Sequence, residues 1–218
     1  MNTKLRQKLN KYLADDNDFR RTYDYTKQRF EASPQLTGHN FEHARRDTIN
    51  SIAIGEPENA DMAVVLCSAV MHDIGFLYGA HRSVHGEIGA EKLFEFLRDG
   101  GITLESAKLE RIAECIRTHK GATHGISPVS LEAKVVADAD LLDKFGPVGL
   151  YQTILSFGEL GFVPEDVIRR MFGRTHLQFE TSTGTKLGSG LQSYNQEFAE
   201  SLERAYAPYG FDVSKEKL

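Results

Sequence analysis

MAVVLCSAVMHD, residues 62–73, joins the longest apolar run of the chain to a histidine and an aspartate. A helix that is apolar almost all round is buried inside a protein. The run spans ten residues, whereas a membrane-crossing helix needs about 20. An unpaired buried carboxylate is costly, so Asp73 at the end of a core helix needs a cation, a hydrogen-bond network or solvent. The stretch predicts a central, buried helix over 58–73 that carries His72 and Asp73 at its end.

Helical periodicity extends over most of the chain, without a convincing series of strands. The breakers Ser33-Pro34, Gly100-Gly101 and Ser127-Pro128 fall between predicted helices. The segment TSTGTKLGSG, residues 181–190, lacks the pattern of a phosphate-binding loop and is predicted as a surface loop. The pattern predicts an all-α fold. Besides 58–73, the predicted helices are 3–14, 17–31, 40–54, 84–98, 103–119, 130–144, 147–157, 164–172 and 191–206.

The composition is typical of a soluble globular protein, with 40% hydrophobic and 26% charged residues among 218. Since a domain takes roughly 150 residues and no linker separates two cores, we expect one domain over 1–218. The net charge of -5 argues against a broad electrostatic surface for duplex nucleic acid.

Cysteine usage and the N-terminus bear on the compartment. Cys67 and Cys115 lie in apolar stretches without a CxxC spacing, which favours neither a disulfide framework nor a cysteine-based zinc site. The first residues are polar and basic, without the apolar region of a secretion signal. We therefore expect a cytoplasmic protein with no membrane partner.

Aspartates also interrupt a second apolar helix, AKVVADADLLDK at 133–144. Asp140 falls on the face that carries apolar residues, whereas Asp138 falls on a different face. The spacing does not separate the two decisively, and either is compatible with an ordinary solvated acid.

Histidines lie on three further predicted helices. His85 and His119 share faces with apolar residues, a place usually taken by a hydrogen-bonded core histidine. His43 differs, because Arg46 and Asp47 follow it on the same face, as on a solvated helix surface. Taken one at a time, each of these histidines is better explained as a core or surface residue than as a metal ligand.

Together, five helices each bring an imidazole or a carboxylate to what is predicted as one interior point, and a divalent cation would satisfy all of them. Mixed donors of this kind suit Mn²⁺, Fe²⁺, Co²⁺, Ni²⁺ or Zn²⁺ better than Ca²⁺, and Mg²⁺ is a further candidate.

The ordered set resembles the HD superfamily of metal-dependent phosphohydrolases, whose pattern is a His, then His-Asp, then an Asp. It is similar to a branch of small, mostly uncharacterised bacterial HD hydrolases, in which the first His lies in a GHDWxHxxRV-like segment; residues 38–47 read GHNFEHARRD. The resemblance covers about residues 36–206 and implies an all-helical HD-domain bundle with the N-terminal helices packed on it. Its further segments are HGEIGAEKL at 85–93, IAECIRTHK at 112–120 and SLEAKVVADADLLDKFGPVGL at 130–150.

The resemblance implies a metal centre. The predicted metal ligands are His43, His72, Asp73 and Asp140. We favour one divalent ion per chain, although related HD proteins with additional histidines hold two, so a second ion stays open. Such an ion polarises a phosphoryl oxygen and lowers the pKa of water from about 15.7 to about 7.

Other residues are predicted to act on the substrate. The catalytic candidates are Asp73, as a proton acceptor, His119 and Lys120. A phosphorylated substrate also needs positive charge and hydrogen-bond donors around its oxygens. The predicted substrate-binding residues are His85, Arg46 and Lys144, with Arg82 as a further cation and His81 and His124 as further donors, although a solvated loop is at least as compatible with His81 and Arg82.

The chain departs from the family pattern at several positions. Asn40-Phe41 replaces Asp-Trp and Asp47 replaces Val, changes that we expect to affect packing more than metal binding. Leu141 and Gln152 stand where basic residues are common, which would weaken phosphate binding. Phe76 stands where some HD nucleotidases have a glutamate that acts as a general acid.

The favoured function is hydrolysis of a phosphoester or phosphoanhydride bond in a nucleotide or another small phosphorylated metabolite, by a monomer or homodimer. Two other classes stay open: a di-iron oxygenase built on the HD fold, and a non-catalytic nucleotide-sensing protein. We expect no duplex nucleic acid as a partner.

Overall fold

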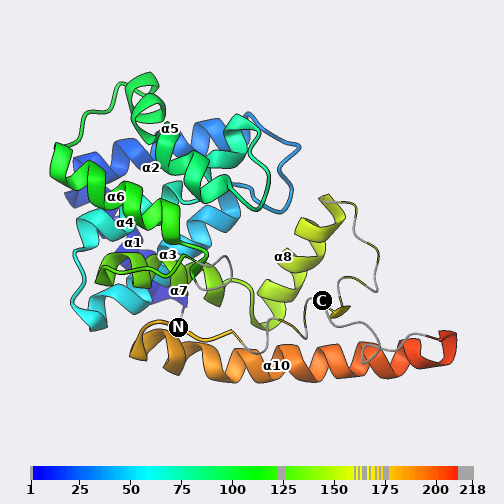
Figure 1. Cartoon of the computed structure of the whole chain (residues 1–218). Coiled ribbons are helices and arrows are strands. Elements are labelled where there is room, and N and C mark those ends of the chain that lie inside the picture. The colour runs from blue at the N-terminus through cyan, green and yellow to red at the C-terminus, as the bar shows by residue number, and fades with distance from the viewer. Residues whose placement is uncertain are drawn as a thin grey trace.

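The computed structural model describes residues 2–121, 126–159 and 177–210, together with single residues between 161 and 173. Every regular element in this part of the chain is an α-helix or a short 3-10 helix, which confirms the predicted all-α fold. Most of the helices gather in one bundle, while α8 and α10 extend beyond it (Figure 1). The elements are α1 (Asn2–Asp15), α2 (Asn17–Glu31), α3 (Phe41–Glu58), α4 (Met62–Met71), η1 (Ile74–Tyr78), α5 (His85–Asp99), α6 (Ser106–Thr118), α7 (Leu131–Leu142), α8 (Gly146–Glu159), α10 (Ser182–Tyr206) and η3 (Ala207–Tyr209).

Helix α4 is the centre of the bundle. It packs against α2, α3, α6 and α7. Its residues from Val64 to Met71 are buried, as its apolar sequence predicts. Burying one Val, Leu, Ile or Met side chain contributes about 1.5–3 kcal/mol, so this helix holds its neighbours together. Its end is therefore fixed from several sides, and His72 and Asp73 follow there.

The other helices bury one face each. Phe96 of α5 is fully buried and its ring lies 4.8 Å from that of Tyr25 on α2. Helix α1 packs on α2 and α3. Both N-terminal helices therefore lie on the bundle that carries the motifs.

The boundary between α3 and α4 differs from the prediction. Helix α3 continues to Glu58, with Pro57 inside its last turn, instead of ending at residue 54. Asn59 then takes a left-handed conformation with φ 58°, and the Asp61 side chain accepts a hydrogen bond from the Ala63 amide to begin α4. Asparagine tolerates this conformation and aspartate is a favoured N-cap, so two separate caps make the break.

The predicted surface loop at residues 181–190 is wrong, because most of it is the first part of α10. Thr181 is the N-cap and accepts a hydrogen bond from the Gly184 amide. The glycines here serve close packing: a Cβ on Gly184 would lie 2.3 Å from Asp138 Oδ2, and one on Gly188 would lie 2.1 Å from the Phe179 ring.

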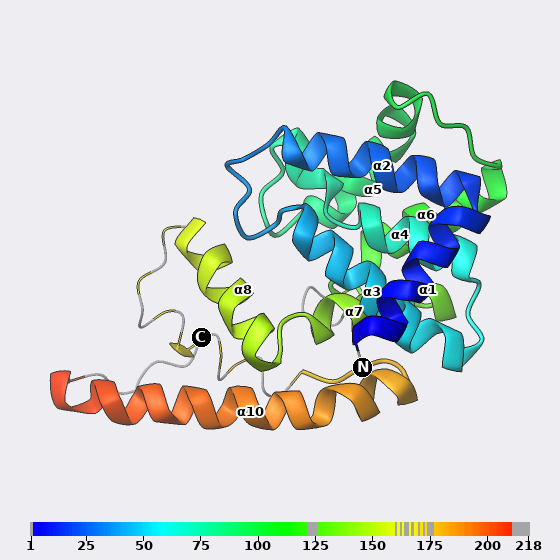
Figure 2. The same cartoon turned by 180° about the vertical axis from the view of Figure 1, so that it is seen from behind.

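Helices α8 and α10 lie against each other, and α10 begins on α7 and α3 of the main bundle and runs on past it (Figure 2). A small apolar cluster of Leu150, Met171 and Ala199 lies there. The predicted helix at 164–172 falls largely outside the described residues. No described helix is both long enough and apolar enough to cross a bilayer.

Candidate metal centre

The end of α4 presents the His-Asp pair to the interior. His72 is fully buried and Asp73 is 2% exposed. The Nδ1 of His72 lies 2.8 Å from the carbonyl oxygen of Ala69, to which it donates a hydrogen bond. This donation leaves Nε2 of His72 unprotonated in the neutral ring, as a metal ligand requires.

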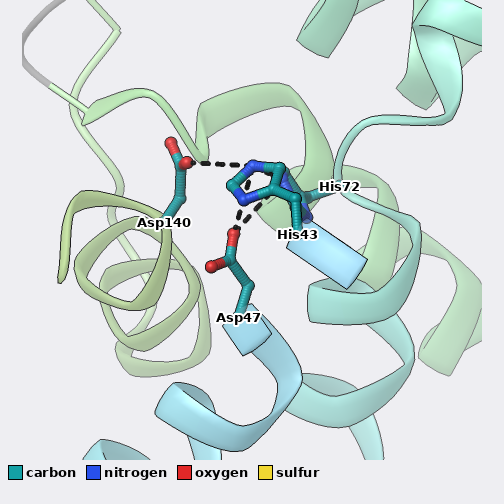
Figure 3. Close-up of side chains that lie close together, drawn as sticks. All are labelled: His43, Asp47, His72 and Asp140. Atoms are coloured by element: carbon teal, nitrogen blue, oxygen red, sulfur yellow. Dashed lines mark hydrogen bonds and ion pairs between the residues drawn. The ribbon is translucent and has the colours of Figure 1, made fainter. Parts of the chain in front are cut away.

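Three helices bring four donors to one point (Figure 3). His43 and Asp47 come from α3, His72 follows α4, and Asp140 comes from α7. One donor atom of each lies within 4.8 Å of all the others, and all four side chains are buried. The Nε2 atoms of His43 and His72 are 3.3 Å apart, and Asp140 Oδ1 lies 3.6 Å from His43 Nε2.

Asp73 connects this group to a second one. Its Oδ2 lies 3.5 Å from His43 Nε2 and 3.4 Å from His72 Nε2. Its Oδ1 lies 3.0 Å from His85 Nε2 and 3.7 Å from His119 Nε2. The carboxylate therefore stands between two pairs of imidazoles.

His85 and His119 form that second pair. Their Nε2 atoms are 3.0 Å apart, while their Nδ1 atoms donate to the carbonyls of Arg82 and Ile116 at 2.8 and 2.7 Å. Burial lowers the pKa of both histidines, and for His119 the neighbouring His85 lowers it further. These rings are thus held in the neutral form.

The donors fit a bound cation. In each pair of imidazoles the two Nε2 lone pairs face each other, and only a proton or a cation between them removes the repulsion. Neither oxygen of Asp47 has a hydrogen-bond partner among the described residues, and the same is true of Asp73 Oδ2. A divalent ion would satisfy these atoms together.

The charges lead to the same conclusion. Asp143 pairs with Arg46 and Asp140 with Lys144, whereas Asp47 and Asp73 have no arginine or lysine partner in the described part of the chain. Burial lowers the pKa of His72, but the charges of Asp73 and Asp47 outweigh it and raise that pKa to about 10, so a proton on His72 partly balances these carboxylates when no ion is bound. A divalent cation displaces that proton, and with both imidazoles neutral the two carboxylates match its charge. Burial raises the pKa of Asp47 well above its usual value, and the charge of Asp143 raises it further.

An outer layer of residues holds His43 in place. Its Nδ1 lies 2.8 Å from Asp143 Oδ2, to which it donates. The Arg46 guanidinium donates to both oxygens of Asp143, at 2.7 and 2.9 Å, and to Gln152 Oε1 at 2.8 Å. Partners of this kind fix the ring orientation and tautomer of a ligating histidine. Arg46 thus contacts His43 indirectly, through Asp143.

A pocket of about 310 Å³ lies beside the donors. Lys120 and Lys144 line it together with His119, Asp140 and Leu141. Lys144 Nζ also donates to Asp140 Oδ2 at 2.5 Å. Burial and the neighbouring charge of Lys144 together lower the pKa of Lys120 to about 8. Two of the predicted cationic residues therefore meet at this pocket.

The other predicted residues have different surroundings. His85 is buried, and Phe76 stacks on its ring at 4.3 Å between centroids. Leu141 lines the pocket where a basic residue is common in the family. The predicted donor His124 lies outside the described residues.

The sequence analysis missed two residues of the centre. Asp47 is 1% exposed, so its assignment to a solvated helix surface is wrong. Its position four residues after His43 was the available signal, because that spacing stacks two side chains on one helix face. Asp143 is 5% exposed and lies one turn after Asp140 on the same chain segment.

Comparison with known proteins agrees with this geometry. Residues 40–144 match the family model of the HD domain. The uncharacterised protein YpgQ of Bacillus subtilis is 28% identical over 130 residues, which cover 58% of this chain and 61% of YpgQ. The matched part thus spans less than two thirds of that relative.

Solved structures share the fold. A Lactobacillus plantarum protein has a TM-score of 0.70 at 19% identity, with 88% of this chain and 98% of that chain covered. A predicted HD superfamily hydrolase from an uncultured Thermotogales bacterium has a TM-score of 0.59 at 25% identity, covering 86% and 92%. YpgQ in complex with ADP has a TM-score of 0.60 at 21% identity, covering 86% and 96%. Residues 40–144 of this chain therefore match the HD domain family, and the chain shares the fold of these solved structures.

Proposed function

We propose that this chain is a metal-dependent phosphohydrolase that cleaves a phosphoester or phosphoanhydride bond in a small phosphorylated metabolite, with a nucleotide as the favoured substrate. One observation carries the proposal. The Nε2 atoms of His43 and His72 face each other at 3.3 Å among unpaired buried carboxylates, and a pocket lined by Lys120 and Lys144 lies beside them.

The proposed ligands of the ion are His43, His72, Asp73 and Asp140. A bound divalent ion polarises a phosphoryl oxygen and makes hydroxide available at neutral pH. The protein holds the donors in place beforehand, through Ala69 for His72 and Asp143 for His43. Mn²⁺, Fe²⁺, Co²⁺, Ni²⁺, Zn²⁺ and Mg²⁺ are all compatible with mixed imidazole and carboxylate donors.

The chain's own residues have distinct proposed roles. Asp73 is the proposed proton acceptor, through Oδ2, the carboxylate oxygen that has no hydrogen-bond partner among the described residues. Lys120 and Lys144 neutralise the phosphoryl oxygens from the pocket wall. Arg46 takes a different role from the predicted one, because it donates to Asp143 and Gln152 and so positions His43.

The comparison with YpgQ favours a nucleotide, and the pocket volume is compatible with a small molecule. YpgQ, which has the same fold, has been crystallised with ADP. The pocket volume of about 310 Å³ lies at the lower end of the range for small-molecule sites, about 300–1,000 Å³. We further propose that the protein works in the cytoplasm as a monomer or homodimer.

A second ion is a further candidate at Asp73, His85 and His119, because Asp73 Oδ1 and the two facing Nε2 atoms lie within 3.0–3.7 Å of one another. With one iron in each of the two sites, the protein would also be compatible with the alternative function, a di-iron oxygenase. Oxygen consumption by the iron-loaded protein distinguishes that alternative from hydrolysis, which consumes none.

The test is a screen of Mn²⁺-loaded protein against nucleoside mono-, di- and triphosphates, with release of phosphate and pyrophosphate measured. We expect activity on at least one of them, and its loss in His72→Ala and Asp73→Ala together with the loss of bound metal. Asp61→Asn is the control, because Asp61 caps α4 on the protein surface. Activity that survives both alanine variants contradicts the proposal.

A further inference from the structure

Asp47 is a buried acid of the metal centre that lacks a hydrogen-bond partner on both carboxylate oxygens within the described residues. It lies on α3 and is 1% exposed. A buried carboxylate without hydrogen-bond donors is strongly unfavourable. The groups that face Asp47 Oδ2 are the two imidazoles of the metal centre, His43 and His72. The family pattern that residues 38–47 resemble has Val at this position.

The Asp47 carboxylate points at the imidazole pair. Its Oδ2 lies 3.5 Å from His43 Nε2 and 3.4 Å from His72 Nε2. Asp73 Oδ2 lies at those same two distances, 3.5 and 3.4 Å. The pair of imidazoles is thus flanked by two carboxylate oxygens with equivalent placement (Figure 3 shows Asp47).

Such spacings are those of atoms that share one ion. Nitrogen and oxygen ligands lie about 2.0–2.2 Å from a transition-metal ion, so neighbouring ligands stand roughly 3 Å apart. The donor atoms of His43, Asp47, His72 and Asp140 all lie within 4.8 Å of one another. A small inward movement of the side chains brings them to one ion.

We propose that Asp47 is an additional ligand of the divalent ion, which gives this centre three carboxylates and two imidazoles and shifts its preference toward Mn²⁺ or Mg²⁺. Carboxylates suit these harder ions, whereas imidazole-rich sets suit Zn²⁺. The inference rests on the metal centre of the proposed function. It adds a residue that the HD pattern does not contain.

The experiment compares wild type, Asp47→Asn and Asp47→Val after chelator treatment and dialysis. Isothermal titration with MnCl₂ gives the affinity, and thermal melts with EDTA or with Mn²⁺ give the stability. We expect Asp47→Asn to weaken Mn²⁺ binding at least about tenfold. In EDTA we expect both variants to melt a few degrees above wild type, because the unpaired charge is gone. With saturating Mn²⁺, the order reverses.

This reversal distinguishes a metal ligand from a structural residue. Replacing a structural residue would lower the melting temperature both in EDTA and with Mn²⁺. Asp138→Asn is the matched control, since Asp138 is also buried but accepts three hydrogen bonds from Glu180 and Thr181. We expect it to lower the melting temperature in both conditions and to leave Mn²⁺ affinity unchanged.

Three results overturn the inference. If wild type binds no Mn²⁺, the metal centre of the proposed function fails as well. If wild type binds Mn²⁺ and Asp47→Asn binds it equally well, only the role of Asp47 fails. If Asp47→Asn does not fold in EDTA, the carboxylate itself stabilises the metal-free protein, and the inference fails on that ground. When Asp47→Val alone does not fold, Asp47→Asn decides.

Discussion

Replacing Asp143 with asparagine tests whether the hydrogen bond from His43 Nδ1 to Asp143 orients His43 as a metal ligand. Asp143 Oδ2 accepts a hydrogen bond from His43 Nδ1 at 2.8 Å, and Arg46 holds the same carboxylate at 2.7 and 2.9 Å. Loss of such a partner typically weakens metal affinity about 10- to 100-fold. That range corresponds to about 1.4–2.8 kcal/mol, since each tenfold change is about 1.4 kcal/mol.

The expected result for Asp143→Asn is thus a Mn²⁺ dissociation constant about 10- to 100-fold above wild type. The melting temperature in EDTA is the weaker readout, because two effects oppose each other. The variant loses the ion pair with Arg46, but it also relieves the repulsion that Asp143 exerts on Asp47. Titration of the chelated protein with MnCl₂ is therefore the decisive assay.

Gln152→Ala is the control. It removes the amide that accepts from Arg46 but leaves Asp143 on His43. We expect its Mn²⁺ affinity to stay near the wild-type value. If Asp143→Asn binds Mn²⁺ as tightly as wild type, the orientation of His43 by Asp143 does not contribute to the site, and the reasoning is refuted.

Three further predictions concern other parts of the molecule. Metal at 1,000 times its dissociation constant adds about 4.1 kcal/mol, which for a chain of this length raises the melting temperature by roughly 8–16 °C; an unchanged melt after chelation would count against a bound ion. Because the pKa of Lys120 is lowered to about 8, its positive charge is present below that pH and is lost above it. We expect KM for a phosphorylated substrate to rise above pH 8, and to stay flat in Lys120→Arg, where the charge persists; equal pH profiles of the two proteins would exclude this role. A Cβ on Gly75 would lie 2.0 Å from the carbonyl oxygen of His85. Gly75→Ala should therefore cost about 1–3 kcal/mol of unfolding free energy, and wild-type stability in a denaturant titration would show that the contact relaxes freely.

Sequence reasoning was sufficient for the all-α fold, and the four residues that it proposed as metal ligands lie close together in the structure. The apolar run before His72 predicted a core helix, whereas the spacing within 133–144 did not separate Asp140 from Asp138 decisively. The structure explains the difference between these aspartates: Asp140 lies 3.6 Å from His43, whereas Asp138 accepts hydrogen bonds from Glu180 and Thr181. Neighbours that are distant in sequence, such as Thr181, leave no local signal.

Asp47 shows a different limit. It follows His43 at the spacing that puts two side chains on one helix face, but the same face also carries Arg46 and Asn50, which suggests solvent. The structure buries Arg46 partly, through its pairing with Asp143, and so a polar face becomes an interior one. The predicted loop at 181–190 failed for a related reason, because two of its three glycines, Gly184 and Gly188, pack closely against Asp138 and Phe179 instead of forming a turn.

The anchoring of Asp138 has a consequence for the order in which the chain is made. A ribosome delivers every proposed ligand of the ion once residue 140 has emerged, so a nascent chain could already capture metal. Asp138, two residues earlier, gains its partner Thr181 only 43 positions later. A polypeptide released before that point keeps an acidic group inside its interior with no donors to receive it. A chain that ends between these positions should therefore be less stable than the full chain.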